Sequence, residues 1–136
     1  MEKQFLSETL AAPAAPANGQ MPSSLELAFV GDTLYDLYVR GRLIGAVSKV
    51  KNLHAAAASQ VNATAQSNAL ERIEPLLSEA EQDVVRRARN AKQHAPKNAN
   101  PRDYHRATGF EALLGYLYLR GDMNRINELM AVALNP

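Results

Sequence analysis

Residues 24–40, SLELAFVGDTLYDLYVR, restrict the fold more than any other stretch, because their apolar side chains fall on almost every face of a helix. A helix that is apolar all round is normally buried in a core. Gly31 and Asp32 lie in its middle. Glycine weakens a helix interior by roughly 1 kcal/mol relative to alanine, and a buried carboxylate needs a partner or loses its charge. Two unfavourable residues side by side indicate function, and the alternative is that Asp32 pairs with an arginine inside the core.

The composition predicts one all-α domain. The chain has 136 residues and a hydrophobic content of 46%, which is enough for a buried core, and its apolar positions follow helical spacing. The absence of cysteine excludes disulfides, thiolate zinc sites and cysteine nucleophiles. No stretch approaches the ~18 consecutive apolar residues of a membrane span, and the N-terminus lacks the pattern of a secretory signal. We therefore expect a cytoplasmic protein that has no membrane partner.

Six or seven helices are expected. Residues 1–22 contain three prolines and are expected to be a flexible leader, and residues 23–136 the domain. The first helix should end near Arg40-Gly41, with a short link over residues 42–46. The next helix reaches residue 57 and either continues or breaks near Ser59 into residues 61–73. The expected N-terminal caps of the later helices are Ser48, Ser78 with Glu81 as a capping box, Asp103 and Asp122.

A second apolar helix, residues 107–119, also surrounds a single carboxylate, that of Glu111. Gly115 lies one turn further along the same face, which would leave space beside the glutamate. If the two helices cross, Asp32 and Glu111 meet, and a divalent cation between them removes the repulsion of the two carboxylates. Hard oxygen ligands favour Mg²⁺ or Mn²⁺. The alternative is a buried salt bridge of Glu111 with Arg106 or Arg40.

Residues 83–106 form a basic segment, with seven basic and two acidic side chains and a net charge of +5. Its middle, residues 93–101, contains two prolines and two asparagines and is predicted to be an exposed loop. Such a surface suits phosphate contacts, although a solvated charged face is the alternative. A metal-bound water beside a nucleic-acid-sized basic surface indicates phosphodiester hydrolysis. The expected phosphate-contacting residues are Arg86, Arg87, Arg89, Lys92 and Lys97.

Other titratable residues give weaker signals. Asp36 lies one turn after Asp32, and a capping or salt-bridge role is expected for it in preference to a place beside the metal. The histidines at positions 54, 94 and 105 have no carboxylate or histidine partner at ligand spacing. No zinc site is therefore expected.

Three ordered motifs carry a family resemblance. LELAFVGDTLYDLYVR resembles the signature of the ribonuclease III family. Together with RRARNAK…PKNAN and YHRATGFEALLGYLYL, it resembles the short branch called Mini-ribonuclease III, which has a catalytic domain and no double-stranded-RNA-binding domain. The resemblance spans residues 25–134. It implies an all-α endonuclease-domain fold, a homodimer and Mg²⁺-dependent cleavage of double-stranded RNA, with ribosomal RNA precursor of the large subunit as the substrate in that branch.

The resemblance assigns catalytic and metal-binding roles to Asp32 and Glu111, and RNA contact to the basic segment. Full-length ribonuclease III has further acids at positions that are here Leu25, Ala28 and Thr108, so the number of bound metals stays open. Two other interpretations stay open as well. One is a non-catalytic RNA-binding or ribosome-associated protein on a degenerate nuclease domain, and the other is a helical dimeric scaffold that binds no RNA.

Overall fold

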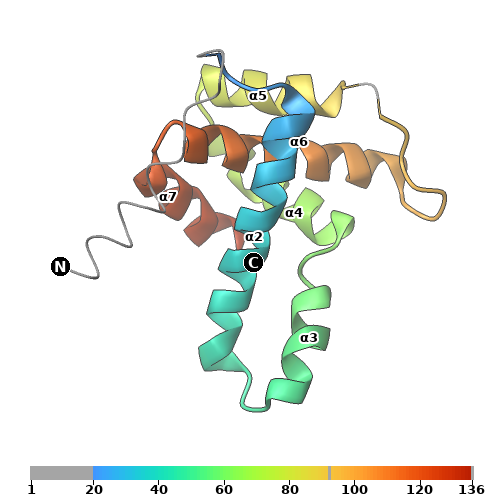
Figure 1. The fold of residues 1–136 in the computed structure, drawn as a ribbon, viewed down its shortest axis with the longest axis vertical. Coiled ribbons are helices and arrows are strands. Elements are labelled where there is room, and N and C mark those ends of the chain that lie inside the picture. Colours follow the sequence, from blue (N-terminus) through green and yellow to red (C-terminus); the bar gives the residue numbers. More distant parts are fainter. Residues whose placement is uncertain (1–19, 92, 136) are drawn as a thin grey trace.

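The computed structural model describes residues 20–91 and 93–135, and this part of the chain consists of helices and the loops between them (Figure 1). The expected leader over residues 1–22 lies almost entirely outside the described residues. None of the described helices is long and apolar enough to span a membrane. The elements in chain order are α2 (Ser24–Ala46), α3 (Val50–Ala58), α4 (Ala63–Ile73), the 3-10 helix η1 (Glu74–Leu76), α5 (Glu79–Arg89), α6 (Pro101–Leu119) and α7 (Met123–Ala133).

Helices α2 and α6 cross in close contact and organise the rest of the fold (Figure 1). A Cβ atom on Gly31 would overlap the backbone carbonyl of Glu111, and a Cβ on Gly115 would overlap the backbone carbonyl of Leu27. Each glycine therefore lets its helix approach the backbone of the other. The space that Gly115 was expected to leave is filled by the backbone of α2 at Leu27.

The main core lies behind this crossing. Tyr35 of α2 and Phe110 of α6 meet edge to face, with ring centroids 5.3 Å apart, and α4 and α7 close the core from the other side. Burial of these large side chains stabilises the crossing. The residues that contribute most volume in full burial are Tyr35, Phe110, Leu70, Ile73, Leu113, Leu114, Ile126, Leu129 and Val39.

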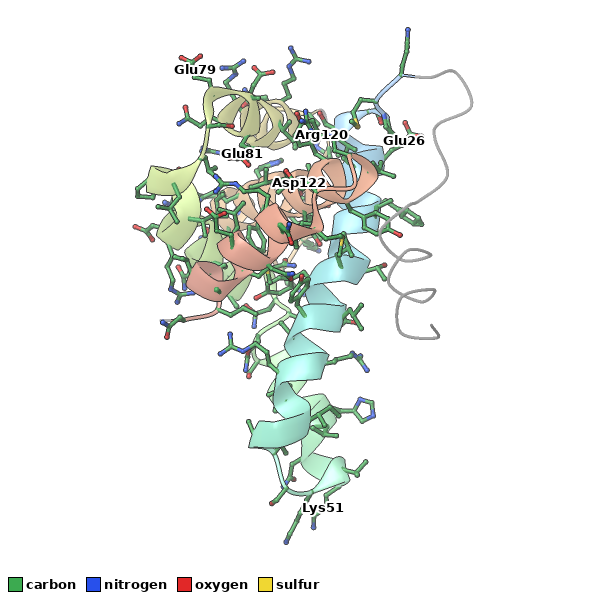
Figure 2. All side chains as sticks on the ribbon, turned by 90° about the vertical axis from the view of Figure 1, so that its left-hand side faces the viewer. Glu26, Lys51, Glu79, Glu81, Arg120 and Asp122 are labelled. Atoms are coloured by element: carbon green, nitrogen blue, oxygen red, sulfur yellow. The ribbon has the colours of Figure 1, made fainter. Side chains whose placement is uncertain are left out.

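The second half of α2 and the antiparallel α3 extend away from the other helices as an arm (Figure 1). Figure 2 places Lys51 at the far end of this arm and Glu26 and Arg120 at the opposite end of the molecule. The predicted end of the first helix at Arg40-Gly41 is wrong, because α2 continues to Ala46. Leu43 is buried in the core cluster, so the continuation has packing to stabilise it.

The expectation that the first helix is buried on every side is also wrong. Phe29 is 77% exposed and Leu37 60% exposed, whereas the opposite face of α2 is buried. The two exposed side chains border one groove of about 730 Å³, whose other walls come from Val30, Thr33, Leu34, Tyr38, Gly41, Arg42, Tyr118 and Met123. This apolar helix therefore has one face in the core and one face that the other described residues leave uncovered.

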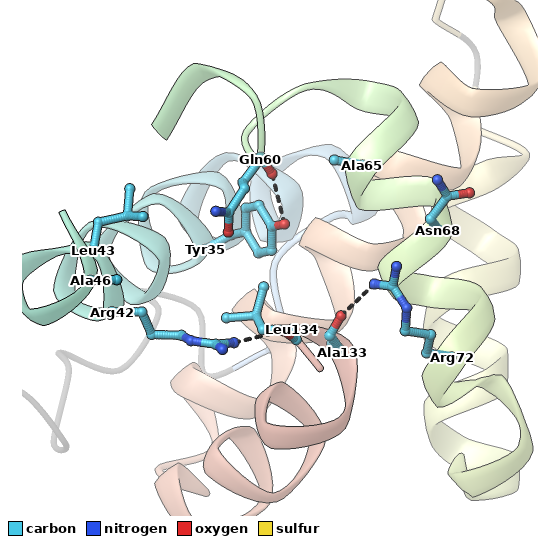
Figure 3. A pocket seen from close by; sticks show the side chains of 10 residues that line it. All are labelled: Tyr35, Arg42, Leu43, Ala46, Gln60, Ala65, Asn68, Arg72, Ala133 and Leu134. Atoms are coloured by element: carbon cyan, nitrogen blue, oxygen red, sulfur yellow. Dashed lines mark hydrogen bonds between the residues drawn. The ribbon is translucent and has the colours of Figure 1, made fainter. Parts of the chain in front are cut away.

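Two arginines fasten the end of α7 to the body, as Figure 3 shows. Arg42 donates to the carbonyl of Leu134 at 2.8 Å, and Arg72 donates to the carbonyl of Ala133 at 2.7 Å. These carbonyls have no partner within a helix end, so the guanidinium groups cap it. A hollow of about 430 Å³ lies between the two arginines. Because both guanidinium groups already cap α7, we assign this hollow a structural role.

The caps of the helices were partly predictable. The Ser78–Glu81 capping box and the Asp122 cap are confirmed, and α3 ends at Ala58, which selects the break near Ser59. Ser48 is wrong as a cap, because Lys49 precedes α3 without a side-chain hydrogen bond. Asp103 is wrong as well, because Asn100 caps α6 and Pro101 is its first residue, a position that suits proline.

A candidate active site between α2, α4 and α6

The close crossing of α2 and α6 brings Asp32 and Glu111 together. Gly31 touches the backbone of Glu111, so the next residue of α2 lies at the glutamate side chain, and the two carboxyl groups are in hydrogen-bonding contact. Both border one hollow of about 410 Å³, whose other walls come from α4, from the loop before α6 and from Tyr104, Ala107 and Thr108 of α6. Glu111 is half-buried and Asp32 is exposed, so the pair faces solvent rather than a sealed interior.

Burial raises the pKa of Glu111 to about 9, with contributions from the hydrogen bond and the negative charge of Asp32, while a hydrogen bond from Gln66 acts in the opposite direction. A carboxyl group with such a pKa keeps its proton at neutral pH unless a positive charge arrives. Perturbed carboxyl groups in a surface hollow are typical of functional sites.

The salt bridges proposed as alternatives for the two acids do not form. Arg40 pairs with Asp36 at 3.0 Å, and the buried Arg106 pairs with Glu74 and donates to the hydroxyl of Ser67 at 2.9 Å. The preference for a salt-bridge role of Asp36 is therefore confirmed. Neither Asp32 nor Glu111 has an ion pair with a described basic residue. The Asp32–Glu111 pair lacks a compensating cation from these side chains.

Neutral polar groups surround the acid pair, and the sequence pattern did not distinguish them. Gln66 of α4 is 4% exposed and donates from Nε2 to Glu111 Oε2 at 3.5 Å. Gln93 donates to the hydroxyl of Tyr104 at the rim of the same hollow. Thr108 donates to the carbonyl of Tyr104 at 3.0 Å. Gln66 lies in a tract of small residues that predicts only close packing, so spacing alone gives no signal for it.

The donor set of this hollow fits a hard divalent cation. Asp32 and Glu111 supply adjacent carboxylate oxygens, and a dication removes both their repulsion and the cost of ionising Glu111. No group of three or more histidine or acidic side chains suited to a metal occurs among the described residues. Two carboxylates with water in the remaining positions suit Mg²⁺, which usually keeps several waters.

The predicted phosphate-contacting residues lie on α5 and the loop after it. The side chains of Arg86 and Arg87 are largely exposed, and both pair with Asp83. The stem of Arg89 lies against Gly109 of α6, two residues before Glu111. Lys97 is exposed in the loop, and Lys92 lies outside the described residues. The described members of this set lie on α5 and in the loop after it, and none of them lines the hollow.

A second, smaller hollow adjoins the first at Asp32. Its volume is about 290 Å³, and it is lined by α2 and α3 through Asp32, Thr33, Asp36, Arg40, His54, Ala57, Ala58 and Val61. Asp32 borders both hollows. Asp32 therefore lies between the two hollows, with Glu111 on one side and the Asp36–Arg40 ion pair on the other.

Comparisons with known proteins give the family and the fold of the chain. Residues 25–122 match the Ribonuclease III domain family. The chain is 53% identical over 112 residues to a Mini-ribonuclease 3 of Symbiobacterium thermophilum, covering 80% of this chain and 85% of that protein, and 44% identical over 114 residues to a Mini-ribonuclease 3 of Thermoanaerobacter sp., covering 82% and 80%. A crystal structure of a protein from Fusobacterium nucleatum superposes with a TM-score of 0.77 at 28% identity, covering 84% of this chain and 94% of that one.

Proposed function

Because the chain belongs to the ribonuclease III family and is an endoribonuclease, we propose that it cleaves double-stranded RNA with Mg²⁺ at a site formed by Asp32 and Glu111. Mn²⁺ is expected to substitute for Mg²⁺. We propose ribosomal RNA precursor of the large subunit as the substrate, as the resemblance to the Mini-ribonuclease III branch implies. The observation that carries the site assignment is the meeting of two carboxyl groups, one with a pKa of about 9, without a basic partner among the described residues.

Each acid has a role in this proposal. Asp32 and Glu111 hold the cation, directly or through water, and the bound cation supplies an activated water and neutralises charge on the reacting phosphate. Glu111 must release its proton to become a ligand, so cation binding and proton release are coupled. The exposure of Asp32 lets a phosphate of the RNA backbone reach the pair from solvent.

RNA contact is proposed for Arg86, Arg87, Arg89, Lys92 and Lys97. A-form RNA is recognised mostly by its shape and by its backbone, so these residues are expected to give affinity with little sequence preference. Arg86, Arg87 and Arg89 lie on α5, the stem of Arg89 lies against Gly109 of α6, and α6 carries Glu111. The RNA backbone can thus lie along α5 and the loop while one phosphate enters the hollow.

The test uses isosteric substitutions of the two acids. Asp32→Asn and Glu111→Gln should reduce Mg²⁺-dependent cleavage of a labelled RNA duplex to background, while the affinity for the duplex measured without divalent cation stays within about threefold, because phosphate contacts dominate that affinity. Asp36→Asn is the matched control, since it changes an aspartate one turn away that pairs with Arg40. It should retain at least about a tenth of the wild-type rate.

Three outcomes would separate the interpretations. Normal turnover by either Asp32→Asn or Glu111→Gln would contradict the site assignment. A wild-type protein that binds the duplex and never cuts it, with Mg²⁺ or Mn²⁺ present, would support a non-catalytic RNA-binding protein. A wild-type protein that binds no RNA at low salt would leave only a structural scaffold.

A further inference from the structure

Among the described residues, Gln66 is the buried side-chain amide that contacts the acid pair. Its side chain is 4% exposed, it borders the same hollow as Asp32 and Glu111, and its Nε2 donates to Glu111 Oε2 at 3.5 Å. A buried side-chain amide is costly without hydrogen-bond partners. Its place against a half-buried carboxyl group therefore calls for an explanation beyond space filling.

Hydrogen bonds hold the backbone on both sides of Gln66. Asn62 caps α4 one turn earlier by accepting from the backbone of Ala65 at 2.8 Å. On the other side, Ser67 receives two hydrogen bonds from Arg106 of α6, one at its hydroxyl and one at its carbonyl. Arg106 is itself held by Glu74. The register of α4 on α6 is thus fixed at the residue next to Gln66.

The chemistry of an amide suits this position better than that of a charged donor. A lysine or arginine here would neutralise Glu111 permanently and compete with a cation. An amide donates one hydrogen bond to Glu111 and leaves the charge of the carboxylate uncompensated. It can therefore orient the carboxylate without replacing a metal ion.

We propose that Gln66 is a positioning residue, whose amide holds the Glu111 carboxylate in the orientation that a divalent cation shared with Asp32 requires. This inference rests on the proposed metal-binding function of the acid pair. Groups that hydrogen-bond to metal ligands fix the orientation of those ligands, and their loss typically weakens metal affinity about 10–100-fold. The same range is expected here for loss of the amide.

The direct test measures Mn²⁺ binding to the RNA-free protein by electron paramagnetic resonance of the free ion. Gln66→Met keeps the length and the volume of the side chain and removes the donor, so it should weaken Mn²⁺ binding about tenfold or more. Cleavage should then need a correspondingly higher Mg²⁺ concentration, while the affinity for the duplex without metal stays unchanged. Gln82→Met is the matched control, because Gln82 donates to the carbonyl of Leu77, away from the acid pair.

A second variant keeps the test informative if Gln66→Met folds poorly. Gln66→Glu adds a third carboxylate to the acid pair, so Mn²⁺ should raise the melting temperature of this variant by more than it raises that of the wild type. The Mn²⁺-induced rise of the melting temperature should be smaller in Gln66→Met than in the wild type. Equal Mn²⁺-induced shifts in all three proteins, or unchanged Mn²⁺ affinity of Gln66→Met, would overturn the role of Gln66. If Asp32→Asn and Glu111→Gln also bind Mn²⁺ like the wild type, the acid-pair assignment itself fails.

Discussion

At the scale of single residues, ionising Glu111 lowers the stability of the metal-free folded protein. Its pKa rises from 4.5 to about 9 in the folded protein, chiefly through burial and then through Asp32. Between these two pH values the folded state holds a proton that the unfolded state has released. The folded state binds more protons there, so the free energy of unfolding must fall as the pH rises through this window.

Glu111→Gln should remove this pH dependence in metal-free protein. The neutral amide has no proton to lose, so at pH 8 the free energy of unfolding of the variant should exceed that of the wild type by about 2 kcal/mol. This value is smaller than the free energy that corresponds to the whole pKa shift, because the side chain of Glu111 is only half-buried. Urea unfolding at pH 5 and pH 8 measures the difference. Saturating Mg²⁺ should stabilise the wild type at pH 8 and leave the variant unchanged, and a wild-type stability that is flat or rising between the two pH values would contradict the assignment.

At the scale of helices, the crossing of α2 and α6 depends on backbone contact at glycine. Gly115→Ala would push a methyl group into the carbonyl of Leu27, and two packed helices cannot separate locally without loss of core contacts. The variant should lose about 3 kcal/mol of unfolding free energy. Its melting temperature, compared with that of Gly45→Ala, measures the effect.

Gly45→Ala is the matched control for this crossing. Gly45 is also a helical glycine, one residue before the end of α2, but a Cβ atom there meets nothing within 4 Å. The substitution should raise stability by up to about 1 kcal/mol, because alanine is the better helix former. A neutral Gly115→Ala would mean that the helices are not locked at this contact.

The helix α5 and the loop after it form the element to which RNA contact is assigned. Arg87→Ala combined with Lys97→Ala should weaken duplex binding at every sequence tested, and should reduce the slope of log affinity against log salt by about one for each lost phosphate contact. The control is Arg120→Ala, at the far end of α6, where Arg120 stacks on Tyr116 at 5.2 Å. An equal loss of affinity in the control would refute a localised RNA surface.

Sequence reasoning succeeded where local patterns decide the structure. The capping box at Ser78, the cap at Asp122 and the oddity of Gly31 beside Asp32 are all readable from adjacent residues. It failed where tertiary packing decides. The continuation of α2 past Gly41 depends on the burial of Leu43, and the role of Gln66 depends on α4 meeting Glu111 across the hollow. No spacing rule connects residues that only the packing of separate helices brings together.

At the scale of the whole molecule, the uncovered face of α2 indicates a partner. The groove that Phe29 and Leu37 border is mostly apolar, and contiguous exposed apolar surface of this kind typically marks an interface. Phe29 also borders the hollow of the acid pair, so a molecule seated in the groove would lie next to that pair. We propose a second copy of the chain as this partner, because one acid pair cuts one strand and a closed two-fold dimer supplies two.

Leu37→Lys tests this dimer. Leu37 is 60% exposed in the single chain, so the lysine should cost the isolated fold about 0.5 kcal/mol or less, whereas an unpaired charge in a dimer interface is strongly unfavourable. Light scattering should give the mass of a dimer for the wild type and of a monomer for Leu37→Lys. Val50→Lys is the control, because Val50 is 78% exposed on α3 and does not line the groove, and it should stay dimeric. A monomeric Leu37→Lys that retains its acid pair should nick one strand where the wild type breaks both, and a wild type that is monomeric while cutting both strands in a single encounter would exclude the proposed assembly.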